Sequence, residues 1–194
     1  VWYRKAAEQG NASAQNDLGV RYAEGQGVPQ DYREAVAWFR KSAMQGNAVA
    51  QYNLGLRYHH GQGVSQDYRE AVTWYRKAAD QGDSSAQNNL GVIYADGLGV
   101  PQNYREAATW FRRAAEQGDV MAQKNLGLRY ADGQGVAKDA VIAYALFNLA
   151  AAGGNKGGQE NRSKMAEQLT PRQLEGGQAL SSAWELGTPL PAKS

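Results

Sequence analysis

Two adjacent histidines, His59 and His60, are the side chains of this sequence best suited to metal binding or proton transfer. Neighbouring residues on a helix point about 100° apart, whereas two histidines that chelate one metal on a helix stand four residues apart. We therefore predict neither a metal site nor a catalytic histidine, and we expect both rings at a solvated or ligand-contacting helix end. The sequence contains no cysteine, which excludes disulfides, thiol catalysis and thiolate metal ligands.

Glycine pairs of the form Gly-x-Gly, such as Gly25 and Gly27, share part of the pattern of a phosphate-binding loop. A dinucleotide-binding loop follows a strand and opens a helix, whereas these pairs close a predicted helix. The sequence therefore predicts no cofactor.

Pairs of basic residues recur through the chain, as at Arg40-Lys41 and Arg76-Lys77. A basic stripe is one signature of nucleic-acid binding, but acidic residues such as Glu34 and Glu70 alternate with it. The net charge is only +2, from 21 basic and 19 acidic residues. We therefore expect a solvated outer face and no nucleic-acid partner. No apolar run approaches the roughly 20 residues that span a bilayer, so we predict no membrane insertion.

A sequence repeat positions all of these residues. Trp2, Trp38, Trp74 and Trp110 stand 36 residues apart, and most of the sequence around each tryptophan repeats with it. A period of 20–50 residues is typical of repeat architectures, in which each unit buries its apolar face against its neighbours. Such chains usually present an extended surface to a partner.

One unit predicts two helices joined by a glycine-rich turn. Asn11 is a good N-cap, and an apolar stripe of helical period follows it, which defines helix A. Asp31, followed three residues later by Glu34, predicts a reciprocal capping box at the start of helix B. Gly46 is expected to end helix B.

Helix A carries a glycine at the same phase in each unit, at Gly19, Gly55, Gly91 and Gly127. Glycine inside a helix costs about 1 kcal/mol relative to alanine. We therefore predict that a neighbouring helix approaches closely there, and that the ring of a helix B tryptophan or tyrosine fills the space.

The paired helices, with Leu-Gly-x-x-Tyr in helix A and Tyr-x-x-Ala in helix B, resemble tetratricopeptide units. The 36-residue period, the Gly-x-Gly-Val turn and the run Asp-Tyr-x-x-Ala-x-x-Trp-(Phe/Tyr) resemble the Sel-one-like repeat (SLR) family more narrowly. The positions that carry the resemblance, with their counterparts in later units, are Ala14, Leu18, Gly19, Tyr22, Gly25, Gly27, Val28, Tyr32, Ala35, Trp38, Ala43 and Gly46.

This resemblance implies an all-α, right-handed α-solenoid of antiparallel helix pairs that forms one continuous domain. Residues 1–10 supply helix B of a truncated leading repeat, and four repeats follow at 11–46, 47–82, 83–118 and 119–154. The last repeat departs from the pattern at Ala140, Ile142 and Leu146, as expected where a stack ends. Residues 155–187 are expected to form capping helices, with 155–158 as a loop, one helix over 159–169 and another from Thr170. Residues 188–194 are expected to be a frayed tail.

In the tetratricopeptide family helix A lines the concave groove, so the resemblance places the candidate partner-binding residues there. Transferred by phase, they are Asn16, Val20, Glu24, Tyr52, Asn53, Leu56, Arg57, His59, His60, Asn88, Asn89, Asp96, Lys124, Asn125, Arg129 and Asp132. The same face includes Val49 and Met121. Because the units differ most here, this strip either reads a partner or is simply free to vary, and Tyr52 is the best single candidate for a contact.

Asparagine and arginine recur beside that strip, as at Asn53, Asn125, Arg57 and Arg129. Two interpretations stay open: these side chains clamp a peptide backbone or carboxylate, or they hydrogen-bond between repeats.

The function that these observations favour is a non-enzymatic scaffold or adaptor that binds a peptide or protein surface in the concave groove. Two alternatives stay open: a hydrolase acting on cell-wall or β-lactam substrates, as the resemblance suggests, and a structural spacer of a larger protein. The chain begins within a repeat and without an initiator methionine, so we expect a fragment whose compartment is open.

Overall fold

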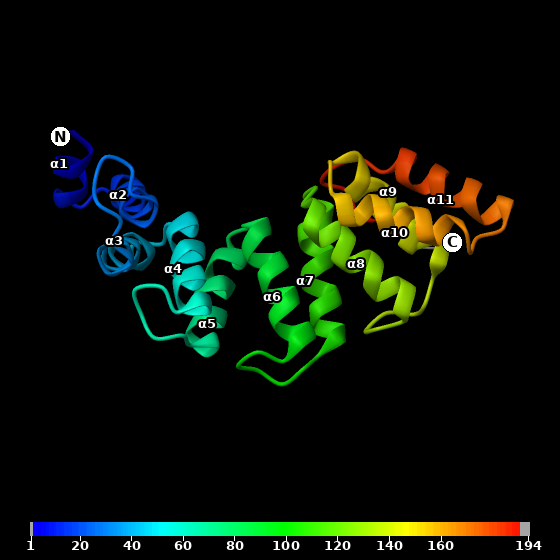
Figure 1. Cartoon of the computed structure of the whole chain (residues 1–194), viewed down its shortest axis with the longest axis horizontal. Coiled ribbons are helices and arrows are strands. Elements are labelled where there is room, and N and C mark those ends of the chain that lie inside the picture. The colour runs from blue at the N-terminus through cyan, green and yellow to red at the C-terminus, as the bar shows by residue number, and fades with distance from the viewer. Residues whose placement is uncertain (1, 191–194) are drawn as a thin grey trace. The chain divides into compact units, whose positions relative to one another are not determined.

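The computed structural model describes residues 2–190, with side chains from Arg4 onward, so Val1, the side chain of Trp2 and residues 191–194 of the expected tail lie outside the described residues. All regular elements in the described range are α-helices, as predicted (Figure 1). They are α1 (Trp2–Glu8), α2 (Ala12–Glu24), α3 (Tyr32–Met44), α4 (Ala48–His60), α5 (Tyr68–Asp80), α6 (Ser84–Asp96), α7 (Tyr104–Glu116), α8 (Val120–Asp132), α9 (Ala140–Ala152), α10 (Lys156–Ala166) and α11 (Pro171–Ala183).

The helices belong to two compact units, which are described separately. One unit holds residues 1–86 with 98–100, and the other holds 87–97 and the chain from 101 onward. Helices that follow one another pack in pairs within each unit, α2 with α3 and α4 with α5 in the first, and α8 with α9 in the second. The expectation of a single continuous domain stays a prediction.

Side-chain caps fix where the helices begin. Asn11 Oδ1 accepts the backbone N–H of Ala14 at 2.9 Å, and Asp31 Oδ1 accepts those of Arg33 and Glu34 at 2.8 and 3.1 Å. The reciprocal half of the predicted capping box is wrong, because the backbone N–H of Asp31 donates to the Tyr22 carbonyl instead. A complete capping box occurs at Thr170 and Gln173.

The phased glycines of the A helices allow close packing, as predicted, but against a different ring. A Cβ on Gly19 would lie 2.6 Å from the Phe39 ring, and one on Gly127 would lie 2.6 Å from the Phe147 ring. The same contact joins Gly55 to Tyr75 and Gly91 to Phe111. The ring therefore belongs to the aromatic residue that follows the tryptophan position of the repeat, which is Leu146 in the last repeat, and it is a tyrosine only at Tyr75.

The basic pairs make specific contacts in addition to lying on an outer face. In three pairs the second residue stacks on the tryptophan of its own helix, with the Lys41 and Lys77 ammonium groups 4.1 Å from the ring centroids of Trp38 and Trp74, and the Arg113 guanidinium 4.7 Å from that of Trp110. The first residue donates to a tyrosine hydroxyl on the next helix, as Arg40 does to Tyr58 at 2.6 Å and Arg112 to Tyr130. The first residue of each of these pairs therefore joins successive helices. Arg40, Lys41, Lys77 and Arg113 are exposed, as expected of a solvated outer face, and Arg112 is half-buried.

Buried glutamines form a second set of contacts between helices. Gln51 Nε2 donates to the Ala43 carbonyl at 3.1 Å, and Gln51 Oε1 accepts from Gln81 Nε2 at 2.7 Å. Gln15 makes both of these contacts as well, with Ala7 and Gln45. In the last repeat the donor is missing because Gly153 stands at the corresponding position, and the buried Gln123 Oε1 has no partner among the described residues.

This missing hydrogen-bond donor gives a first prediction. The double change Val120→Ala and Gly153→Gln is expected to raise the free energy of unfolding by about 1 kcal/mol, the usual gain from one satisfied buried hydrogen bond. Val120 must shrink because its Cγ1 occupies the space of a Cβ on Gly153. Urea unfolding followed by circular dichroism checks the result. Gly153→Gln alone is the control and is expected to destabilise, and equal stability of the two variants would contradict the account.

The C-terminal helices explain why α9 departs from the repeat pattern. α11 packs on α9, where Gly177 lies against the Tyr144 ring and Asn148 Nδ2 donates to Ser181 Oγ at 2.9 Å. α9 is therefore covered on a face that the preceding B helices leave polar, and Ile142 there replaces a glutamate. A helix buried on several sides is expected to be apolar all round.

Two sequence predictions for this region need correction. The first capping helix begins at Lys156 and not at 159, because Asn155 is its N-cap and accepts the Gly158 N–H at 2.8 Å. Residues 188–190 are not frayed: Leu190 is buried, and its backbone N–H donates to Glu116 Oε1 at 3.1 Å.

Candidate functional site

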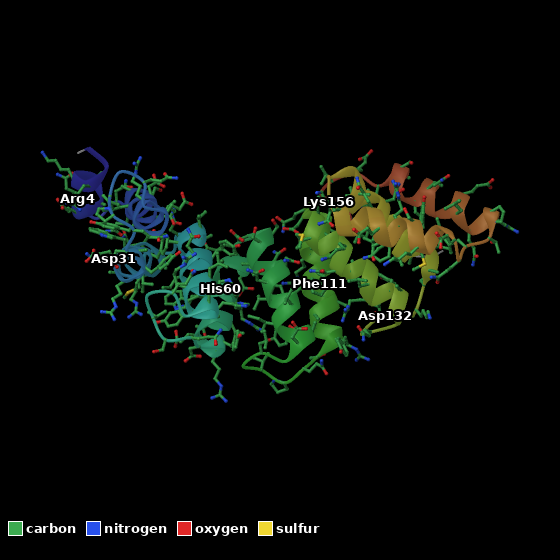
Figure 2. All side chains as sticks on the ribbon, viewed as in Figure 1. Arg4, Asp31, His60, Phe111, Asp132 and Lys156 are labelled. Carbon is green, nitrogen blue, oxygen red and sulfur yellow. The ribbon has the colours of Figure 1, made fainter. Side chains whose placement is uncertain are left out.

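The A helices carry every candidate residue of the predicted binding face. In the first unit these residues lie on α2 and α4, and in the second on α6 and α8. Figure 2 labels His60 of the first set and Asp132 of the second. Glu24, His60, Asp96 and Asp132 are exposed, whereas Asn16 is buried. The remaining candidates are half-buried: Val20, Tyr52, Asn53, Leu56, Arg57, His59, Asn88, Asn89, Lys124, Asn125 and Arg129.

Asparagines join successive A helices within each unit. Asn53 Nδ2 donates to Asn16 Oδ1 at 3.0 Å, and Asn125 Nδ2 donates to Asn88 Oδ1 at 3.0 Å. Hydrogen bonding between repeats, one of the two interpretations left open by the sequence, is therefore present. Each of these amides has a structural partner, which reduces the number of side chains available to a peptide backbone.

The two arginines of the A helices also have structural contacts. The Arg57 guanidinium lies 5.3 Å from the centroid of the Tyr32 ring, and Arg129 lies 5.3 Å from that of Tyr104. Both are cation–π distances. The Nε atoms of both arginines are buried and have no hydrogen-bond partner among the described residues. A carboxylate clamp by these arginines stays a prediction.

An aromatic cluster surrounds His59 in the first unit. The His59 ring lies edge-on to Tyr68 and Tyr75, at centroid distances of 5.3 and 6.2 Å, and 4.7 Å from His60. The Tyr52 ring belongs to the same cluster, and its centroid lies 5.9 Å from that of Tyr75. Burial, with a smaller effect from the charge of His60, lowers the pKa of His59 below its ordinary value of 6.5. His59 Nδ1 is buried without a hydrogen-bond partner among the described residues, so a proton there has no acceptor.

This environment predicts a pH dependence of stability. A histidine whose folded pKa is lowered binds fewer protons than it does in the unfolded chain, so its contribution to stability is lost as the pH falls below 6.5. We expect the wild type to lose more stability between pH 7.5 and 5.5 than His59→Ala, which places there the alanine found at 23, 95 and 131. Thermal unfolding at both pH values checks this. The same loss in both proteins would contradict it.

Exposed apolar side chains mark two places on the A-helix face. Val49 is 51% exposed and Met121 is 44% exposed, and both stand near the start of their helices. The free energy falls when a partner covers exposed apolar groups, because apolar surface is removed from water. In contrast, no three His, Cys, Asp or Glu residues of the described chain are grouped so that they could hold a metal ion. Within residues 2–190, no helix combines the length and apolar character needed to cross a membrane.

The sequence did not predict a hollow that lies in the second unit, beside the candidate residue Asp132. It lies between α8 and α10, has a volume of about 290 Å³ and also involves Lys138, Lys164 and Met165. Its lining residues are Leu128, Ala131, Asp132, Lys138, Ala140, Phe147, Asn161, Lys164, Met165 and Gln168. The signal that could have found it is the replacement of the repeated tyrosine by Ala140, which removes a ring from this position.

Comparison with known proteins places these features in a family. The family model described as Sel1 repeat matches residues 1–11, 12–47, 48–83, 84–119 and 120–155. The crystal structure of a protective antigen of uropathogenic Escherichia coli, which displays an SLR fold, matches with 42% identity and a TM-score of 0.89 over 94% of this chain. A Sel1 repeat protein from Oxalobacter formigenes matches with 41% identity and a TM-score of 0.78 over 82% of this chain.

The chain spans only part of these relatives, 39% of the antigen and 64% of the Oxalobacter protein. None of the curated proteins compared with the chain matches it.

Proposed function

Since the chain belongs to the Sel1 repeat family, whose repeats commonly mediate protein interactions, we propose that it is a non-enzymatic scaffold that binds a peptide or protein surface across its A-helix face. The binding residues are the exposed and half-buried members of the candidate set on α2, α4, α6 and α8. The role is that of an adaptor, in which the repeats supply a constant frame and the variable face supplies selectivity.

The observation that carries this proposal is that some positions of the repeat are constant and structural, whereas others vary from repeat to repeat. Caps, phased glycines, buried glutamines and cation–tyrosine contacts use the same residue types in successive repeats. One phase of the A helices instead carries Asn16, Tyr52, Asn88 and Lys124, and nearby Val49 and Met121 are exposed. Aromatic and apolar groups that are partly exposed on a rigid support are typical of interface hot spots.

Affinity capture tests the proposal, with the wild type compared against Tyr52→Ala/Lys124→Glu on the A face and Arg105→Glu on α7. Arg105 is exposed and lies outside the A helices, so its charge reversal matches that of Lys124. We expect the double variant to lose partners that the wild type and Arg105→Glu both retain. Equal recovery by all three proteins would contradict binding at this face.

A further inference from the structure

The hollow between α8 and α10 has a physical origin in one lost contact, both partners of which are replaced. In two earlier intervals an arginine of one A helix covers a tyrosine of the preceding B helix, as Arg57 covers Tyr32 and Arg129 covers Tyr104. At the corresponding positions of the last interval stand Met165 and Ala140. The guanidinium and the phenol ring are therefore both replaced by smaller, uncharged groups, and the space between them is left open.

The floor of this hollow is apolar. Phe147 and Met165 are buried beneath it, and Leu128, Ala131 and Ala140 are half-buried around them. A volume of about 290 Å³ lies just below the range for small-molecule pockets, roughly 300–1,000 Å³. The hollow therefore suits one large apolar side chain of a longer partner.

The rim of the hollow carries charges that have no partner in the described part of the chain. Lys138 stands where the earlier repeats carry a glutamine, such as Gln30, whose amide donates to the Ala23 carbonyl and the Tyr32 hydroxyl. Lys164 stands where they carry an apolar residue. Within the described residues neither ammonium group forms a hydrogen bond or an ion pair, and the same holds for Asp132 on the rim.

We propose that this hollow binds an acidic peptide segment, with an apolar side chain on the Phe147–Met165 floor and flanking carboxylates on Lys138 and Lys164. This inference rests on the proposed function and names the chemistry of the partner for one part of the A-helix face. Two unpaired lysines outweigh Asp132, which directs the carboxylates towards the lysines and away from its own side of the rim. The occupant is an internal segment of a protein chain.

A library of random dodecapeptides tests this inference when it is displayed at the N-terminus of a phage coat protein, where no peptide has a free carboxyl terminus. The library is selected on the wild type after depletion on Ala140→Tyr/Lys164→Glu. Ala140→Tyr refills the hollow with the residue of the other repeats, and Lys164 is exposed, so the variant is expected to fold, which circular dichroism checks. We expect the enriched peptides to carry an aromatic or aliphatic residue flanked by Asp or Glu.

One enriched peptide, synthesised with a fluorophore and an amidated C-terminus, is then measured by fluorescence anisotropy. We expect Lys138→Glu and Lys164→Glu each to weaken binding about tenfold or more, and Ala140→Tyr to abolish it. Lys156→Glu is the matched control and is expected to bind as the wild type does. It reverses the same charge on α10 at a position well separated from Asp132 in Figure 2 and outside the hollow.

The inference is overturned if no peptide is enriched over the depleted pool, if the enriched peptides are neutral or basic, or if Lys164→Glu binds as tightly as the wild type. Peptides that lose binding on Tyr52→Ala but not on Ala140→Tyr would overturn this inference while supporting the proposed function. Failure of the proposed function would appear separately, as unchanged capture by the Tyr52 and Lys124 variant.

Discussion

Gly127→Ala is expected to lower the free energy of unfolding by about 1–3 kcal/mol, the usual cost of overpacking a well-packed core. The new Cβ would lie 2.6 Å from Cε1 of Phe147, whose ring is buried, so the ring or the helix must shift to admit it. Alanine is the better helix former by about 1 kcal/mol, but this gain is smaller than the clash.

The matched control is Gly176→Ala in α11, in the same unit. A Cβ there meets only Val141 Cγ1 at 3.8 Å, an ordinary van der Waals contact, so this variant is expected to gain about 0.5–1 kcal/mol. Guanidinium unfolding monitored by tryptophan fluorescence measures both. Stabilisation of both variants by the same amount would show that the phase of the A-helix glycines does not reflect close packing.

Removal of residues 170–194 is expected to have the largest effect on the second unit. This deletion strips α11 from α9 and uncovers Tyr144 and the residues that line the small cavity beneath Trp184, among them Ile142 and Leu149. Each large apolar side chain returned to water costs about 1.5–3 kcal/mol, so three of them cost about 5 kcal/mol or more. That is comparable with the whole stability of many domains. We expect a protein that aggregates and binds a hydrophobic dye.

A rescue variant tests whether the truncated chain aggregates because apolar side chains of α9 are exposed or because the chain is shorter. Val141→Arg, Ile142→Glu and Leu149→Arg give α9 the residues found at the same positions of α7, which are Arg105, Glu106 and Arg113. In the truncated chain these changes are expected to restore solubility, whereas in the full chain they are expected to destabilise by burying charges. Analytical ultracentrifugation and thermal unfolding measure both effects. Aggregation of the rescued truncation would contradict the account of α9.

The periodic features of this fold could be predicted from sequence because they repeat. Asn11, the glycine phase of Gly19 and the capping box at Thr170 each follow a local rule, and their structural roles are as predicted. Sequence alone does not distinguish Trp38 from Phe39 as the ring that meets Gly19, because the two residues are adjacent and their directions depend on the packed helices.

The contacts between repeats were harder to predict because they join residues distant in the chain. Nothing local to Arg112 shows that it reaches the Tyr130 hydroxyl, 18 residues away. The hollow at Ala140 and Met165 arises from two substitutions 25 positions apart, each of which reads alone as ordinary drift at the end of a repeat array. The stacking of successive helices brings them together.

Site-specific photocrosslinking tests most directly whether partners contact the A-helix face. p-Benzoylphenylalanine is placed at the exposed positions Val49 and Met121 of that face, and at the exposed positions Thr73 and Thr109 on α5 and α7. Irradiation in a lysate of the source organism is expected to give protein adducts from positions 49 and 121 and none from 73 and 109. Adducts formed only from positions 73 and 109 would contradict the proposal that the variable A-helix face binds the partner.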